Sequence, residues 1–100
     1  MCSIMGFEKK TVGKEELQPF FDRTVSRGPD MSRVVETPTG WLCFHRLAIM
    51  GLTPEGMQPF QLGEDWLVCN GEIYGFRPLK RRLQEEGYTF RSGSDCEILL

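Results

Sequence analysis

The chain has 100 residues, which is enough for one small domain and no more. Its 40% hydrophobic and 26% charged residues are typical of an ordinary globular protein. A net charge of −2 with mixed signs argues against a nucleic-acid partner or a polybasic membrane contact. No apolar run approaches bilayer length, and the first residues lack a basic start followed by an apolar core, so a cytoplasmic protein is expected.

Four cysteines are spread widely along the chain, at Cys2, Cys43, Cys69 and Cys96. None belongs to a CxxC pair, and His45 is the single histidine, so we expect no metal site. Nothing else in the sequence indicates the secreted setting in which disulfides persist. Cys43 and Cys69 lie inside apolar runs and are predicted to be small buried hydrophobes.

The first half of the chain predicts strands around one helix. An apolar strand is expected over residues 2–7. Residues 13–25 have apolar side chains at helical spacing, but Pro19 is poorly tolerated in a helix interior, so this helix should begin close to Pro19 or be kinked there. Residues 41–46 are dense in apolar and aromatic side chains and predict the best strand, with a shorter strand over 33–36.

The second half predicts a strand over 65–69 that runs into Asn70-Gly71, a dipeptide typical of a tight turn with positive φ. A helix is expected over 76–86, because its apolar residues repeat at helical spacing and Gly87 is a good C-terminal cap. Residues 88–90 are a candidate strand.

The last residues contain a helix start. Ser94-Asp95-Cys96-Glu97 spells an S-x-x-E capping box, and three apolar residues follow it. A helix this short has little stability alone, since about a dozen residues are needed for marginal helicity. We therefore expect the chain to be the front part of a longer polypeptide, truncated after the start of a helix at about Ser94.

Cys2 directly follows the initiator methionine. A small side chain at this position permits removal of Met1, after which Cys2 would carry a thiol and a free α-amine. The unperturbed pKa of an α-amine is about 8, and a thiol is the most nucleophilic side chain available. One residue could then supply both a nucleophile and a general base. The alternative, which the dipeptide alone favours, is that Cys2 is simply the second residue of a translated protein.

Five short motifs follow one another along the chain. They are Cys2-Ser3-Ile4-Met5-Gly6, Arg27-Gly28-Pro29-Asp30, Arg46-Leu47-Ala48-Ile49, Asn70-Gly71-Glu72-Ile73-Tyr74 and Ser92-Gly93-Ser94-Asp95-Cys96-Glu97. Together they resemble the N-terminal glutaminase domain of glutamine-hydrolysing asparagine synthetase, a class II glutamine amidotransferase, over residues 2–100. The resemblance implies an α+β fold, the αββα sandwich of N-terminal-nucleophile hydrolases. That domain is longer than this chain, so only its N-terminal part is expected here.

The resemblance also implies catalytic roles. Cys2 would attack the side-chain amide carbon of glutamine, with its own α-amine carrying the proton. The Asn70 side-chain amide and the Gly71 backbone N–H would form the oxyanion hole.

Substrate-binding residues are implied in the same way. Arg46 would bind the α-carboxylate of glutamine, since its guanidinium offers a bidentate fork. Asp95 and Glu72 would bind the α-ammonium group. Backbone groups near Leu47 and Ile49 would complete the cradle.

Each of these residues also has a plainer structural interpretation. Arg46 could be a surface arginine at a strand end, Asp95 a member of the capping box, and Glu72 an exposed residue after a turn. Arg27 and Asp30 are assigned to loop structure.

The leading functional hypothesis is a glutamine amidohydrolase that releases ammonia for an asparagine synthetase-type amidation. The resemblance implies no cofactor in this domain, and ATP and Mg only for a downstream synthetase domain or chain. The alternative is a non-catalytic fragment or interaction module whose unpaired strand edges associate with another chain or in a homo-oligomer. A cysteine-based redox or metal-binding protein is a third hypothesis.

Overall fold

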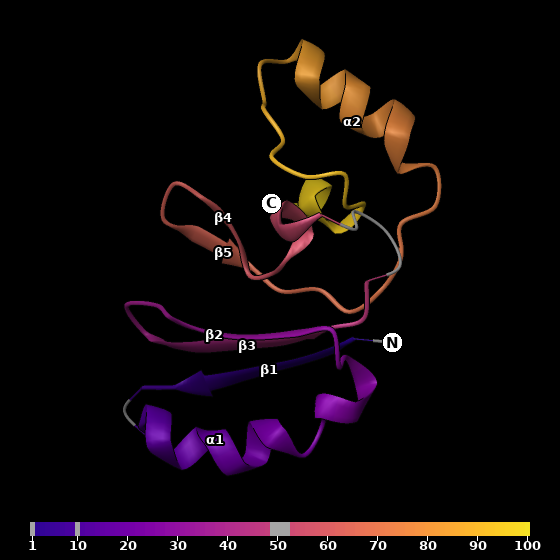
Figure 1. Ribbon diagram of the computed structural model, residues 1–100. Helices are drawn as coiled ribbons and strands as arrows, with labels where there is room; N and C mark the ends of the chain where they lie inside the picture. Colours follow the sequence, from indigo (N-terminus) through magenta and orange to yellow (C-terminus); the bar gives the residue numbers. More distant parts are fainter. Residues whose placement is uncertain (1, 10, 49–52) are drawn as a thin grey trace.

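A computed structural model describes residues 2–9, 11–48 and 53–100 of the chain (Figure 1). The elements, with 3₁₀ helices written η, are β1 Ser3–Glu8, α1 Lys14–Asp22, η1 Val25–Arg27, β2 Met31–Glu36, β3 Gly40–Arg46, η2 Pro54–Gly56, β4 Phe60–Leu62, β5 Asp65–Leu67, α2 Phe76–Glu85 and η3 Cys96–Leu99. This mixture of helices and antiparallel strands confirms the α+β class. Within the described ranges, no helix has the length and apolar character needed to cross a membrane.

The main sheet has three antiparallel strands in the order β1-β3-β2. The central strand β3 is the apolar run that the sequence predicts as its best strand, and both neighbours pair with it over their whole length. Side chains alternate between the two faces of a strand. Cys43 and His45 therefore lie on one face of β3, and Phe44 and Arg46 lie on the other.

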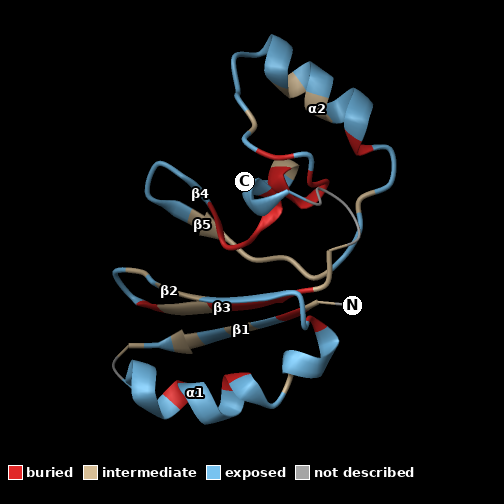
Figure 2. Cartoon of the chain, viewed as in Figure 1, coloured by how far each residue is buried: buried red, intermediate tan, exposed pale blue. Residues whose placement is uncertain are grey.

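The face of the sheet that carries Cys43 packs against α1. Leu17 and Phe21 of this helix form a buried cluster with Cys43. The His45 ring stacks on the Phe21 ring with centroids 3.7 Å apart, and its Nε2 lies 2.7 Å from the Phe21 carbonyl oxygen. Most of α1 is exposed on its outer side, whereas buried residues follow β3 (Figure 2). The opposite face of the sheet is thereby left for Phe44, Arg46 and the second half of the chain.

Of the two alternatives predicted for the first helix, a start close to Pro19 is wrong. The helix begins at Lys14, so Pro19 lies well inside it. Proline has no N–H to donate to the carbonyl four residues earlier, that of Glu15. Glu15 is exposed, so water can hydrogen-bond to this carbonyl and the helix continues through the proline.

The strand predicted over 65–69 is shorter than expected and has a partner that the sequence analysis missed. Strand β5 ends at Leu67 and pairs with β4 in a two-stranded hairpin. Gly63, at the first position of the two-residue turn, has φ of 60°. Positive φ at this position is typical of the tight turns that join antiparallel strands. The hairpin turn therefore lies at Gly63. Gly71 does not adopt positive φ, so the tight turn expected at Asn70-Gly71 does not form.

The second helix is confirmed as α2, and glycines in the left-handed region flank it. Gly75 precedes the helix with φ of 69°, and Gly87 follows it with φ of 104°. Glycine adopts this conformation without a Cβ penalty. The strand predicted over 88–90 is wrong, because these residues form no strand in the structure.

The capping box predicted at Ser94 is only half formed. The Ser94 hydroxyl accepts a hydrogen bond from the Cys96 backbone N–H at 3.3 Å. The Glu97 carboxylate turns away from Ser94 and accepts hydrogen bonds from the backbone N–H groups of Arg91 at 2.8 Å and Ser92 at 2.9 Å. Glu97 therefore fixes the preceding loop, and the segment that follows is the short 3₁₀ helix η3.

Candidate active site

A small cleft of about 70 Å³ lies beside the end of β3, on the face of the sheet away from α1. Phe44 and Arg46 of β3 contribute to its wall, as their alternation along the strand requires. The described residues that line the cleft come from five separate parts of the sequence. Seven predicted site residues line it, namely Cys2, Arg46, Leu47, Asn70, Gly71, Glu72 and Asp95. Ile49, the eighth, lies outside the described residues.

Cys2 is held at the cleft by the register of the sheet. Antiparallel pairing of β1 with β3 places Ser3 opposite His45, so the chain before β1 runs beside the chain after β3. The Leu47 backbone N–H donates to the Cys2 sulfur at 3.2 Å, and the thiol lies 3.5 Å from the Leu47 carbonyl oxygen. The sulfur is half-buried and lies at a fixed position in the cleft.

Arg46 is a buried cation and not a surface arginine. Only 4% of its surface is exposed. Its Nη1 donates to the Thr53 carbonyl oxygen at 2.9 Å, which fixes the direction of the guanidinium group. A buried guanidinium favours an anionic ligand, because burial weakens its solvation and strengthens its attraction to a negative charge.

Asp95 lines the same cleft and supports the segment that follows Asn70. This carboxylate is buried, and its Oδ2 accepts a hydrogen bond from the Ile73 backbone N–H at 2.6 Å. The Cys96 thiol donates to the Gly71 carbonyl oxygen at 3.4 Å. Asp95 therefore has a specific place in the site, beyond the second position of a capping box. Glu72 is exposed at the rim, as its plainer interpretation predicts.

The sequence matches the glutamine amidotransferase domain family over residues 1–100. The chain belongs to this family. Among curated relatives, asparagine synthetase [glutamine-hydrolyzing] 1 of Bacillus subtilis is 34% identical over 108 residues, which cover 100% of this chain and 17% of the relative. A probable asparagine synthetase of Schizosaccharomyces pombe is 41% identical, and asparagine synthetase B of Escherichia coli is 35% identical; this chain covers 19% of each. The resemblance to the glutaminase domain of asparagine synthetases is confirmed, and the chain spans less than a fifth of these relatives.

Three residues of the amidotransferase domain support the cleft although the sequence analysis gave them no such role. Arg27 Nε donates to the Cys2 carbonyl oxygen at 3.5 Å, and Asp30 Oδ2 accepts from the Ala48 backbone N–H at 2.8 Å. Both belong to a motif that carries the family resemblance, which was the available signal. Gln58, whose side chain contacts the backbone of Cys69, had no signal in the sequence beyond its place before a proline.

A Cβ at Gly28 of the same motif would lie 2.3 Å from the His45 carbonyl oxygen. Glycine is required here because the loop crosses the end of β3 at backbone contact distance. This close approach brings Arg27 and Asp30 within reach of the two chain segments that carry Cys2 and Ala48.

The four cysteines of the domain are unpaired and differ in environment. Burial raises the pKa of the Cys43 thiol to about 11. Burial, followed by a hydrogen bond with Cys69 and the charge of Asp95, raises the pKa of the Cys96 thiol well above its usual range. Cys43 is a small buried hydrophobe as predicted, whereas Cys69 is half-buried in the wall of the cleft.

Among the described residues, no group of three His, Cys, Asp or Glu side chains is arranged to hold a metal ion.

The raised pKa predicts that Cys43 resists alkylation in the folded domain. A pKa moved from 9.0 to about 11 leaves roughly 100-fold less thiolate at pH 8, and the thiolate is the reactive form. Reaction of Cys43 with iodoacetamide should therefore stay slow as the pH rises through 9 and increase only near 11. Peptide mapping by mass spectrometry after brief labelling in buffer and in urea measures this difference. Equal labelling of Cys43 under both conditions would contradict its burial.

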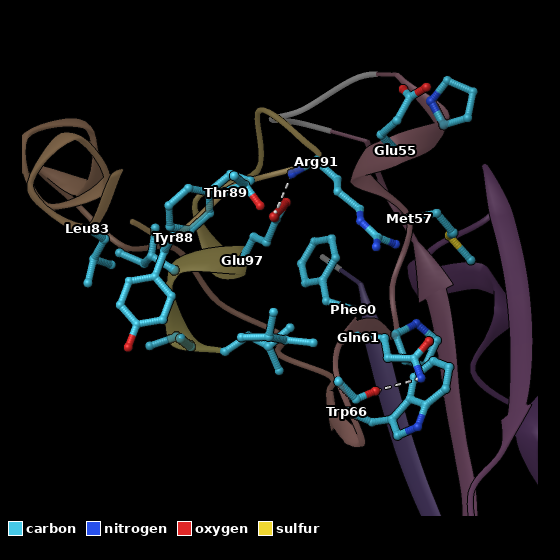
Figure 3. Close-up of a pocket in the computed structure, with 18 of the residues that line it drawn as sticks. Glu55, Met57, Phe60, Gln61, Trp66, Leu83, Tyr88, Thr89, Arg91 and Glu97 are labelled. Atoms are coloured by element: carbon cyan, nitrogen blue, oxygen red, sulfur yellow. Dashed lines mark hydrogen bonds between the residues drawn. The ribbon is translucent and has the colours of Figure 1, made fainter. Parts of the chain in front are cut away.

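A larger hollow of about 510 Å³ lies apart from this chemistry, between the β4–β5 hairpin and residues 88–100 (Figure 3). Its lining is mixed and includes the aromatic side chains of Phe60, Trp66 and Tyr88 together with Arg91. None of the seven predicted site residues that the structure describes lines this hollow, and no cysteine is among its described lining residues. This hollow has the larger volume, but the smaller cleft contains a thiol, a guanidinium group and a buried carboxylate.

Proposed function

We propose that this domain hydrolyses glutamine, with Cys2 as its N-terminal nucleophile. The observation that carries the proposal is the cleft itself. It brings the Cys2 thiol, the Arg46 guanidinium, the Asp95 carboxylate and the Asn70-Gly71 segment around one small space. These groups come from residues far apart in the sequence, and together they match the charges and the reacting amide of glutamine.

The charges of the cleft residues suggest which of them bind the α-carboxylate and the α-ammonium group of glutamine. Arg46 forms hydrogen-bonded ion pairs with the α-carboxylate. Asp95, with Glu72 at the rim, neutralises the α-ammonium group. Backbone groups of Leu47 and Ile49 complete the cradle. A buried cation and a buried carboxylate in the walls of one cleft support a zwitterionic amino acid as substrate, because the α-carboxylate and the α-ammonium group of such a ligand carry the complementary charges.

The chemistry requires removal of Met1, which frees the α-amine of Cys2. This amine takes the thiol proton while the sulfur bonds to the side-chain carbonyl carbon of glutamine. The carbonyl oxygen becomes an oxyanion, which accepts hydrogen bonds from the Asn70 amide and the Gly71 N–H. The C–N bond then breaks as the α-ammonium returns its proton, and ammonia leaves. Water attacks the resulting thioester in the same way, which releases glutamate and restores the thiol.

We propose further that the fold is the αββα sandwich of N-terminal-nucleophile hydrolases. The order of layers supports this assignment, since α1 lies on one side of the three-stranded sheet and the β4–β5 hairpin and α2 lie on the other (Figure 1). The relatives named as glutamine-hydrolysing asparagine synthetases support the use of the released ammonia in asparagine synthesis. In that case a synthetase domain or chain, with ATP and Mg, accepts the ammonia.

The decisive test is covalent labelling by a glutamine-mimicking diazoketone, followed by intact-mass spectrometry. The starting mass reports whether Met1 has been removed; if it has not, a cleavable leader placed ahead of Cys2 generates the free amine. One adduct per chain, mapped to Cys2 and suppressed by excess glutamine, is the expected result. Absence of an adduct from a chain with a free Cys2 amine would overturn the proposal and favour the non-catalytic module.

A further inference from the structure

Gln58 is a buried polar residue with no part in the reaction described above. It lies in the loop between η2 and β4, and only 4% of its surface is exposed. Its Oε1 accepts a hydrogen bond from the Cys69 backbone N–H at 2.6 Å, and its Nε2 donates to the Cys69 carbonyl oxygen at 3.1 Å. One side-chain amide thus satisfies both backbone groups of a single residue.

These two hydrogen bonds take the place of the hydrogen bonds that a neighbouring strand would make with the backbone of Cys69. Strand β5 ends at Leu67, so Cys69 is not part of the β4–β5 ladder. Backbone groups that are shielded from water need hydrogen-bond partners, because an unsatisfied donor or acceptor loses its hydrogen bonds to water without replacement. The primary amide of Gln58 offers one acceptor and one donor, the same pattern that a neighbouring strand would present to Cys69.

The residues after Cys69 are held by two further contacts. The Gly71 carbonyl accepts from the Cys96 thiol at 3.4 Å, and the Ile73 N–H donates to Asp95 at 2.6 Å. Gln58 therefore fixes the beginning of a short segment whose other contacts lie after Asn70. Asn70 and Gly71 lie outside regular secondary structure, so these three contacts help to set the direction of the Asn70 amide and of the Gly71 N–H.

We infer that Gln58 is a positioning residue for the oxyanion hole, an inference that rests on the proposed glutamine hydrolysis. Gln58 lines the cleft, but its amide oxygen and amide nitrogen both hydrogen-bond to the backbone of Cys69, so it acts through that backbone. Donors for an oxyanion must lie within a few tenths of an ångström of their best position, and a misplacement of about 1 Å can cost about 100-fold in rate. Loss of Gln58 should consequently lower kcat more than it changes KM.

The test compares Gln58→Met, Gln58→Glu and the control Gln61→Met. Methionine has a similar length but no amide, whereas glutamate keeps the acceptor for the Cys69 N–H and loses the donor. Gln61 is exposed, and its amide Nε2 donates a hydrogen bond to the nearby Gly63 carbonyl oxygen at 3.1 Å. We expect kcat for ammonia release to fall about 10- to 100-fold in Gln58→Met and less in Gln58→Glu, with KM within about threefold. Gln61→Met should match the unmodified chain.

Backbone hydrogen exchange gives a readout that does not depend on activity. The Cys69 amide should exchange at least about tenfold faster in Gln58→Met, whereas the Ile73 amide should change little. If Gln58→Met does not fold, the same two measurements on Gln58→Glu decide the question. Unchanged kcat together with unchanged Cys69 exchange would overturn the inference, as would a rise in KM at constant kcat. Absence of ammonia release by the unmodified chain would instead overturn the proposed function, and the exchange data would still test the positioning role.

Discussion

Cys2→Ala should abolish the diazoketone adduct and lower glutamine hydrolysis by more than about 10³-fold, the loss expected when a covalent nucleophile is removed. Among the described residues, the thiol makes two hydrogen bonds, both with the backbone of Leu47, so stability should change little. Circular dichroism and thermal melting test this second expectation. The combination of an intact fold and a lost reaction would separate a chemical role for Cys2 from a structural one.

Cys43→Ala is the matched control for this experiment, because it removes another thiol from the opposite face of the same sheet. It should leave the adduct on Cys2 while it lowers stability, since Cys43 belongs to the core under α1. Persistence of the adduct in Cys2→Ala would mean that another residue is labelled, and Cys2 would then lose the role of nucleophile.

Asn70→Ala should lower kcat about 10²- to 10³-fold, the effect typical of removing one oxyanion-hole donor. The substitution should lower kcat and leave KM nearly unchanged, because this hydrogen bond strengthens as the carbonyl oxygen becomes negative. Steady-state measurement of ammonia release as a function of glutamine concentration separates the two constants.

The double variant with Gln58→Met and Asn70→Ala should lose less kcat than the product of the two separate losses, because both substitutions act on one hydrogen bond.

Tyr74→Ala is a suitable control on the same segment. Its side chain is 89% exposed, so its removal should leave kcat and the fold unchanged. If kcat in Asn70→Ala stayed within about twofold of the unmodified chain, the Asn70 amide would have no place in the oxyanion hole.

The agreement between sequence and structure is best where local rules dominate. Residues 41–46 became the central strand of the sheet, because a dense apolar run is stable only with both faces covered. The helix over 76–86 was predicted equally well, from the helical spacing of its apolar residues and from Gly87 as its C-terminal cap. Predictions failed where a partner distant in sequence decided the outcome. The strand expected over 88–90 did not form, and β5 ended at Leu67 because the backbone of Cys69 pairs with a side chain from another loop.

The ordered motifs in the sequence were enough to determine the family, and they identified seven residues that the structure brings to one cleft. This succeeded because chemistry demands particular side chains, such as a thiol, a guanidinium or a carboxylate, and these remain visible in a linear sequence. Only the tertiary structure decided that Arg46 is buried, that Arg27 and Asp30 hold the chain segments around Cys2, and that Gln58 anchors the Asn70 segment. Such supporting contacts are made mostly to backbone N–H and C=O groups, which nearly every residue carries. The sequence of side chains therefore does not indicate where they form. Their partners are chosen by the packing of loops in three dimensions.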